Sequence, residues 1–398
     1  MSDMRPSWAY TLPAALLLMA PFDILASLAM DIYLPVVPSM PDILDTTPAV
    51  IQLTLSLYMI MLGLGQVLFG PLSDRIGRRP VLLSGAVLFA VASLGAALSW
   101  SASAFVLCRL LQATGASAAL VATFATVRDV YGNRPEQAII YATFGSILSF
   151  VPALGPIAGA MIADQFGWRA IFMLLAIMAL MAILAAMVKW HETMPTVTTG
   201  PRRSVRLIFT SRPFWTYTLA FSASMGTFFV FFSTAPRVLI GHAGYSELGF
   251  SVAFATVAVV MIVVTRFAGS FVGKWGVAGC TARGMLLLLV GAAALAFGQL
   301  YGSPSFASFV LPMWIMAVGI VFAGAVTANG ALAEFDDIAG SAVAFYFCIQ
   351  SLIVSVAGTL AVTVLNGDSA WPLVAFSTLM ALLVLMALRL LQCGNAPA

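Results

Sequence analysis

The chain has 398 residues, of which 62% are hydrophobic and 8% are charged, and its mean hydropathy is +1.04. A water-soluble domain of this length could not carry so apolar a surface, so the composition excludes a soluble globular protein and indicates one that crosses a lipid bilayer many times. The formal net charge of +3 is small and scattered, so we expect no nucleic-acid partner. The four cysteines have no metal-ligand spacing, and we expect no metal site.

Twelve apolar segments are long enough to cross ~30 Å of hydrocarbon as helices, which takes about 20 residues each. They lie near residues 11–34, 50–70, 80–99, 104–127, 138–161, 168–190, 213–235, 247–268, 283–300, 305–328, 339–363 and 370–391. One long polar stretch separates the first six from the last six. We therefore expect an all-α integral membrane protein with a six-helix bundle at 1–190, a basic cytoplasmic linker at 191–212 and a second six-helix bundle at 213–398.

The basic residues predict the orientation of the chain. With both termini in the cytoplasm, 15 of the 18 Lys and Arg residues lie inside, Arg169 and Arg237 lie outside, and Arg109 lies within the bilayer. This split satisfies the positive-inside rule. The N-terminus has one basic residue and no small-residue cleavage site before the first span, so we expect that span to remain as an anchor.

The first span carries two carboxylates, Asp23 near its centre and Asp31 near its far end. An Asp at the centre of a membrane helix costs roughly 2.5 to 3.5 kcal/mol, so such an acid requires water, a proton or a partner. Eight helical residues place Asp31 about 12 Å along the axis and about 80° around it, so one broad face can hold both acids. The sequence leaves open which of them takes up a proton. The alternative is that the acids snorkel to water.

The fourth span supplies a basic partner. It contains Arg109, Gln112 and Gly115 at three-residue spacing. An arginine in hydrocarbon is as costly as an aspartate, so we expect Arg109 to pair with Asp31 or Asp23 across a watery cavity. The alternative is an arginine that snorkels to the outer interface.

A charged run follows the second span: Gly70-Pro-Leu-Ser-Asp74-Arg75-Ile-Gly77-Arg78-Arg79. We expect a tight loop that needs Gly77, with Asp74 facing the positive N-terminal end of a helix from the other half, near Gly340. Arg128, at the end of the fourth span, is expected to complete this charge cluster. Such a latch would hold the cytoplasmic side of the protein closed.

The same spacing recurs 199 residues later, after the eighth span, in Gly269-Ser-Phe-Val-Gly273-Lys274-Trp-Gly276. The recurrence predicts that the two halves are related repeats. Gly273 stands where the first half has its acid, so we expect no matching latch in the second half.

The fifth span is rich in small and helix-bending residues: Gly145, Pro152, Gly155, Pro156 and Gly159. Small residues at four-residue spacing let another helix approach closely, and prolines remove backbone hydrogen bonds and bend the helix. We expect this stiff helix to act as a seal between the halves. Ordinary packing between membrane helices is the alternative.

Three further residues are candidates for substrate contact. Phe228 lies in an aromatic run of the seventh span and could stack on a substrate ring, although most rings of such a run must face lipid or neighbouring helices. Tyr33 is a candidate for a hydrogen bond in the cavity or for the interfacial aromatic belt. Gln350 is a candidate for substrate contact or for packing between helices.

These motifs resemble those of the major facilitator superfamily. The run at Gly70 to Arg79 is similar to its signature after helix two, Arg109 and Gln112 to its fourth-helix motif, and Gly155-Pro156 to its antiporter motif. The resemblance implies two six-helix bundles related by a pseudo-two-fold axis, with a central cavity between the halves. Four stretches look more narrowly like the phenicol exporters among its drug/proton antiporters: Ala20 to Asp23, Met30 to Pro35, Met225 to Arg237 and Ala328 to Asp337.

The narrower resemblance covers about residues 4–392. It implies a monomer that exports chloramphenicol and florfenicol through a bacterial inner membrane, with the proton as coupling ion and no cofactor. A proton-coupled importer or a broad multidrug transporter of the same fold is the alternative. An embedded enzyme is not expected, because the sequence contains no HExxH, no GxSxG and no histidine within a span.

Overall fold

The computed structural model describes residues 10–132, 134, 136–194, 206–335 and 338–394, and no β-strand occurs among them. The chain forms two compact units. The first unit comprises residues 1–36 and 40–200, and the second comprises residues 37–39 and 201–398.

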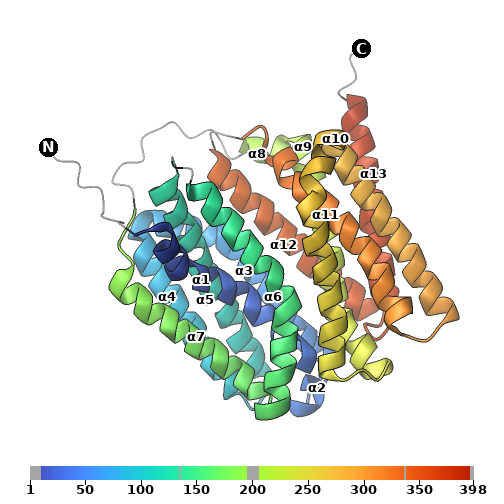
Figure 1. Ribbon diagram of the computed structural model, residues 1–398, viewed down its shortest axis with the longest axis horizontal. Helices are drawn as coiled ribbons and strands as arrows, with labels where there is room; N and C mark the ends of the chain where they lie inside the picture. Colours follow the sequence, from blue (N-terminus) through green and yellow to red (C-terminus); the bar gives the residue numbers. More distant parts are fainter. Residues whose placement is uncertain (1–9, 133, 135, 195–205, 336–337, 395–398) are drawn as a thin grey trace. The chain divides into compact units, whose positions relative to one another are not determined.

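Six long helices build the first unit (Figure 1). They are α1 (Leu12–Asp31), α3 (Pro48–Ile76), α4 (Arg78–Ala97), α5 (Ala102–Tyr131), α6 (Glu136–Phe166) and α7 (Trp168–Lys189), and the short helices η1 (Leu34–Val36) and α2 (Met40–Ile43) lie between the first two. Helix α4 packs against α5 and α7, and α3 packs against α5. Helix α1, which carries both acids, contacts α5, α6 and α7.

The second unit is built from five helices of more than 20 residues and three short ones. They are α8 (Arg206–Thr210), α9 (Arg212–Pro236), η2 (Arg237–His242), α10 (Glu247–Tyr301), η3 (Phe306–Val310), α11 (Leu311–Leu332), α12 (Ala339–Val364) and α13 (Trp371–Gly394). Helix α9 packs against α11, α12 and α13. Of the spans among the described residues it is the most enclosed, since 78% of the residues in its 18-residue apolar stretch are buried. Its aromatic run therefore meets protein on most sides.

The starts of the helices follow from local sequence. The hydroxyls of Ser101, Ser211 and Ser246 each accept a hydrogen bond from the backbone N–H three residues later, and they cap α5, α9 and α10. Pro13 and Pro48 lie in the first turns of α1 and α3, where a backbone N–H has no partner within the helix.

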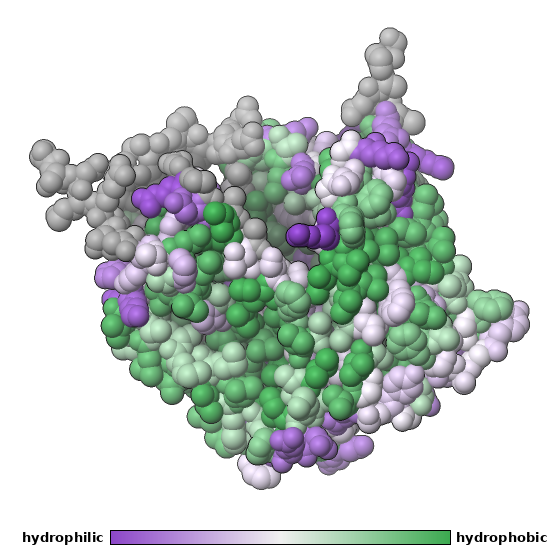
Figure 2. All heavy atoms as spheres, viewed as in Figure 1, coloured by the Kyte–Doolittle hydropathy of each residue, from purple (hydrophilic) through white to green (hydrophobic). Residues whose placement is uncertain are grey.

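Eleven helices in the described part of the chain are long and apolar enough to span a membrane. One of them, α10, runs for 55 residues and has a non-helical residue, Gly276, in its interior. It holds the eighth and ninth predicted spans, so the prediction of twelve spans is confirmed. On the face shown in Figure 2, hydrophobic side chains cover the lengths of the helices, and hydrophilic ones gather toward their ends.

The helices extend further than hydropathy predicted. Helix α3 continues to Ile76, so Gly70 to Ile76, predicted as a loop, are helical, and Gly77 alone forms the turn. Helix α5 likewise reaches Tyr131 and α6 reaches Phe166. Hydropathy marks the apolar part of a span, whereas backbone hydrogen bonding continues into its polar ends.

The internal repeat is visible in the backbone. Gly77 has a φ of +107°, and Gly276, which occupies the matching place in the second half, has a φ of +66°. Residues with a Cβ rarely adopt positive φ, so both turns require glycine. A Cβ on Gly85 would lie 2.8 Å from the carbonyl oxygen of Gly115, and one on Gly284 would lie 2.7 Å from that of Gly319. Each half thus uses a glycine pair to bring two helices into backbone contact.

Two glycines of α11 offer a matched test of this contact. A Cβ at position 319 would lie 2.6 Å from the carbonyl oxygen of Gly284, whereas one at position 324 meets no atom within 4 Å. We expect Gly319→Ala to destabilise the protein by about 1 to 3 kcal/mol through overpacking. Gly324→Ala should be neutral or stabilising, because alanine favours helix. Thermal unfolding in detergent measures both, and equal unfolding temperatures would contradict the assigned contact.

Candidate functional site

The two acids of α1 are both buried. Asp23 is 3% exposed, and its Oδ2 atom has no hydrogen-bond partner among the described residues. Asp31 is 5% exposed, and its Oδ2 atom accepts a hydrogen bond of 3.4 Å from the Ser27 hydroxyl. Both side chains are buried by protein, so neither is an acid that snorkels to water. Asp23 keeps a free acceptor oxygen inside the protein.

Arg109 is fully buried in α5. One of its nitrogens, Nη1, donates to the carbonyl oxygen of Ala29 in α1 at 2.9 Å and to the side-chain oxygen of Gln112 at 2.5 Å. The Gln112 amide donates in turn to the Ser93 hydroxyl at 2.7 Å. Arg109 is therefore tied to α1 and, through Gln112, to α4.

Aromatic rings surround the Arg109 guanidinium. Its central carbon lies 5.0 Å from the centre of the Tyr33 ring, 4.6 Å from that of Tyr58 and 5.8 Å from that of Phe172. The tyrosines are held in turn: the Tyr33 hydroxyl pairs with that of Thr54 at 2.8 Å, and the Tyr58 hydroxyl donates to the Ala26 carbonyl at 2.8 Å. Ring faces are electronegative, so this cage stabilises the cation.

The predicted ion pair between Arg109 and an acid of α1 is not formed in the described structure. Arg109 meets the backbone of α1 at Ala29 and the aromatic rings instead of a carboxylate. Its Nε and Nη2 groups have no hydrogen-bond partner among the described residues. Aromatic faces and backbone carbonyls also compensate a cation, so opposite charge alone does not identify the partners of Arg109.

The glycine-rich face of α6 lies against α1 beside Asp31. A Cβ on Gly155 would lie 3.0 Å from the Cβ of Asp31, and a Cβ on Gly159 would collide with the carbonyl oxygen of Ile32. Gly145 has open space around it. Pro152 and Pro156 lie within the same helix. Two of the five predicted motif residues thus allow close packing on the acid-bearing helix, and the proposed seal between the halves stays a prediction.

The charged residues after the second span form a network around Arg78, which is 2% exposed. Its guanidinium contacts Asp74 at 2.6 Å, Asp129 at 2.8 Å and the Ser73 hydroxyl at 2.7 Å. Asp129 is 5% exposed and also lies 3.7 Å from Arg128. A charge cluster therefore exists within the first unit, with Arg78 and Asp129 at its centre, and it includes the predicted Asp74 and Arg128.

The other predicted latch residues lie around this network. Gly70 has open space where a Cβ would lie, and Arg75 is exposed. The Arg128 side chain is 54% exposed, so its contact with Asp129 is the weakest of the set. The predicted contact of Asp74 with the helix near Gly340 would join the two units and stays a prediction.

In the second unit, Phe228 is the one half-buried ring among the four phenylalanines of its run, since Phe229, Phe231 and Phe232 are buried. Phe231 stacks on Phe254 at 5.3 Å, so the buried rings belong to the core. Gln350 is 5% exposed and accepts a hydrogen bond of 3.4 Å from the Ser351 hydroxyl.

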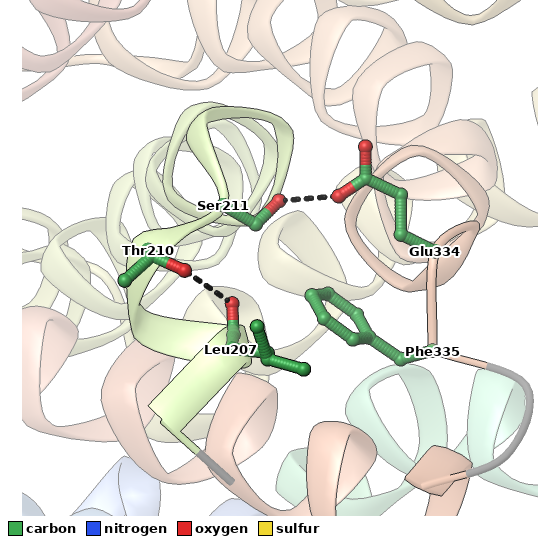
Figure 3. A pocket seen from close by; sticks show the side chains of 5 residues that line it. All are labelled: Leu207, Thr210, Ser211, Glu334 and Phe335. Carbon is green, nitrogen blue, oxygen red and sulfur yellow. Dashed lines mark hydrogen bonds between the residues drawn. The ribbon is translucent and has the colours of Figure 1, made fainter. Parts of the chain in front are cut away.

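A cavity of about 420 Å³ lies where α8 and the start of α9 meet the end of α11 (Figure 3). Leu207, Thr210, Ser211, Glu334 and Phe335 line it. The Ser211 hydroxyl donates to Glu334 at 2.8 Å. No residue of the predicted site lines this cavity.

Two acids that were not predicted from the sequence lie at the charged turn. Asp129 pairs with Arg78, and Glu192 accepts hydrogen bonds from the backbone of Arg78 and Arg79. Both are acids among basic residues. The positive-inside rule explains the basic residues but not the acids, and this exception could have identified them.

Two repeated sets of membrane helices with buried acids and a buried arginine define a membrane transporter. The family model described as Major Facilitator Superfamily matches residues 23–359. The chain therefore belongs to the Major Facilitator Superfamily, and it is a multi-pass membrane transporter of small molecules, not an enzyme.

Comparison with known proteins agrees with this assignment. The chain is 48% identical over 386 residues to a protein of Pseudomonas aeruginosa named chloramphenicol resistance protein, covering 97% of this chain and 92% of that protein. It is 26% identical to the multidrug resistance protein MdtL of Escherichia coli O17:K52:H18, covering 86% and 83%. Its fold is similar to the crystal structure of a POT family transporter in complex with a thioalcohol-conjugated peptide, with a TM-score of 0.78, 13% identity and coverage of 98% and 99%.

The charge network predicts unequal effects of removing its two acids. Asp129→Asn leaves the buried Arg78 without its buried partner, which costs about 3 to 5 kcal/mol in comparable pairs. Asp74 is 41% exposed, so Asp74→Asn should cost about 1 kcal/mol or less. Thermal unfolding of the purified variants in detergent measures the difference. Equal losses would show that Asp129 is not the main partner of Arg78.

Proposed function

We propose that this transporter exports phenicol antibiotics, among them chloramphenicol and florfenicol, from the bacterial cytoplasm in exchange for protons. The observation that carries the proposal is the 48% identity over 97% of the chain with the chloramphenicol resistance protein of Pseudomonas aeruginosa. In this proposal the protein works by alternating access as a monomer in the cell inner membrane, with both termini in the cytoplasm. The proton is the coupling ion, and no cofactor takes part.

Asp23 is the proposed contact for the drug. Phenicols are neutral and carry hydroxyl and amide groups that donate hydrogen bonds. A carboxylate oxygen that is buried and has no partner, as Oδ2 of Asp23 is among the described residues, offers an acceptor for such a donor. Hydrogen bonds to a charged group are worth about 1.5 to 3 kcal/mol, and leaving a buried charged acceptor unpaired costs at least as much.

The second half offers an aromatic surface and an amide. Phe228 is half-buried and lies 6.0 Å from the Phe254 ring, so one side of the Phe228 ring rests on the core. An aromatic ring fixed in this way can stack on the phenyl ring of a phenicol. Gln350 can donate and accept hydrogen bonds. We propose both as substrate contacts.

Proton coupling is assigned to the buried acids together with Arg109. Asp31 is the last residue of α1, and Arg109 contacts the same helix end at Ala29. Nε and Nη2 of Arg109 have no hydrogen-bond partner among the described residues. A guanidinium with unused donors can bind a carboxylate when that acid loses its proton, and release it when the acid is protonated. Tyr33 and Tyr58 hold the guanidinium in place between these states.

The driving force is sufficient for export. Exchange of one proton for one neutral drug moves one charge, so it draws about 2.3 kcal/mol per 100 mV and about 1.4 kcal/mol per pH unit. At a membrane potential of about 100 mV and a pH difference of about one unit, the two terms add to about 3.7 kcal/mol, which sustains a drug gradient of a few hundred-fold.

Asp23→Asn is expected to abolish phenicol resistance at normal expression, because the substitution keeps the shape of the side chain and removes both its charge and its proton. Asp42→Asn, which changes an exposed acid of α2, is the matched control and should retain resistance. The measurement is the chloramphenicol susceptibility of a host that lacks its own efflux pumps, at equal amounts of protein in the membrane. Full resistance with Asp23→Asn would refute the role of Asp23.

Inside-out membrane vesicles test direction and coupling. Respiration acidifies their interior, so an exporter should accumulate radiolabelled chloramphenicol inside them, and a protonophore should abolish the accumulation. Depletion of drug from the vesicles would indicate an importer. Competition by dyes and quaternary amines equal to that by florfenicol would favour a broad multidrug transporter, as the MdtL relative suggests.

A further inference from the structure

The carboxylate of Glu192 binds four backbone N–H groups. Its Oε1 atom accepts from Arg78 at 2.8 Å, from Thr193 at 3.0 Å and from Met194 at 3.0 Å. Its Oε2 atom accepts from Arg79 at 3.1 Å. Glu192 follows the last residue of α7 by three positions, whereas Arg78 and Arg79 are the first two residues of α4. One side chain thus joins two segments that are 113 and 114 residues apart in sequence.

Helix α4 lacks a capping side chain of its own. The first four N–H groups of a helix have no partner within it, and the residue before α4 is Gly77, which has no side chain to offer. Glu192 supplies the missing acceptor and places a negative charge at the positive end of the helix. A Cβ on Gly77 would lie 2.5 Å from the carboxylate oxygen of Glu192, so the turn accepts this cap because it is glycine.

The same helix start carries the charge network. The backbone N–H of Arg78 is held by Glu192, while its guanidinium is held by Asp74 and Asp129. A second hydrogen bond joins α4 to α7: Nη2 of Arg79 donates to the carbonyl oxygen of Met187 at 2.8 Å. The helix start that carries the Arg78 side chain is therefore bonded both to the end of α7 and to Glu192.

We propose that Glu192 is a positioning residue of the transport cycle. It fastens the residues that directly follow α7 to the helix start that carries Arg78, so that a displacement of these residues is transmitted to the Arg78 network. The effect on transport rests on the proposed function. The contact itself and its coupling to Arg78 do not, and they can be tested without a substrate.

Amide hydrogen exchange tests the contact. The N–H groups of Arg78 and Arg79 have no acceptor within α4, so their protection from exchange reports directly on Glu192. In Glu192→Ala we expect these two amides to exchange about tenfold faster, as for the loss of a helix cap. Glu192→Gln, which retains one acceptor oxygen, should give a smaller increase. Glu334→Gln is the matched control, because that carboxylate accepts from the Ser211 hydroxyl and not from a backbone N–H group of α4, and it should change neither amide.

A double-mutant cycle tests the positioning. If Glu192 places the Arg78 side chain, the effects of Glu192→Gln and Asp129→Asn on the unfolding temperature should be non-additive. A cap with a purely local role would give additive effects. In transport assays, Glu192→Gln should lower the maximal rate at least threefold with KM unchanged, whereas Glu334→Gln should retain the wild-type rate.

Three results would overturn the proposal: equal amide exchange in the wild type and Glu192→Ala, additive effects in the cycle, or a wild-type transport rate in a variant whose amides exchange fast. A wild-type protein that does not move chloramphenicol would refute the proposed substrate only, because the exchange rates and the cycle require no transport.

Discussion

The structure depends on the need to compensate charge inside an apolar helix bundle. Lipid tails offer no hydrogen bonds, so a buried ion has to find its partners within the protein. Arg109 finds them in the carbonyl oxygen of Ala29, the amide of Gln112 and the rings of Tyr33 and Tyr58. These partners come from α1 and the residues just after it, from α3 and from α5, so one guanidinium contacts three helices of the first unit. One oxygen of Asp23 has no such partner among the described residues, which leaves a buried hydrogen-bond acceptor on α1.

Close approach of backbones is the second requirement, and glycine meets it in both halves. Gly85 with Gly115, and Gly284 with Gly319, remove the side chains that would separate the helices. On α6, Gly155 and Gly159 do the same against α1. The glycines that pack against α1 lie beside Asp31, so the small residues that bring helices together also shape the surroundings of a buried acid. Packing and the candidate chemistry therefore depend on the same positions.

The charged turn at Gly77 shows how the two requirements combine at the end of the spans. Arg78 is buried and needs Asp74 and Asp129, and the start of α4 needs an acceptor that Gly77 lacks. Glu192 provides that acceptor from a distant part of the chain. The turn therefore receives its hydrogen-bond and charge partners from α3, α5 and the residues after α7.

The sequence by itself determined the number of spans, the repeat and the buried charges. Apolar segments of about 20 residues, a recurring Gly-rich run and an Asp or Arg within a span are local features, and local features can be read without coordinates. The tertiary structure alone decided the partners. Hydropathy could not place the ends of α3 and α5, because polar residues continue a helix beyond the hydrocarbon. Charge complementarity suggested an acid for Arg109, whereas the fold brought aromatic rings and a carbonyl. Asp129 and Glu192 stand out in the sequence as acids among basic residues, but their shared partner was decided by the fold, which brings segments 51 and 114 residues from Arg78 into contact. Such contacts depend on how the helices pack.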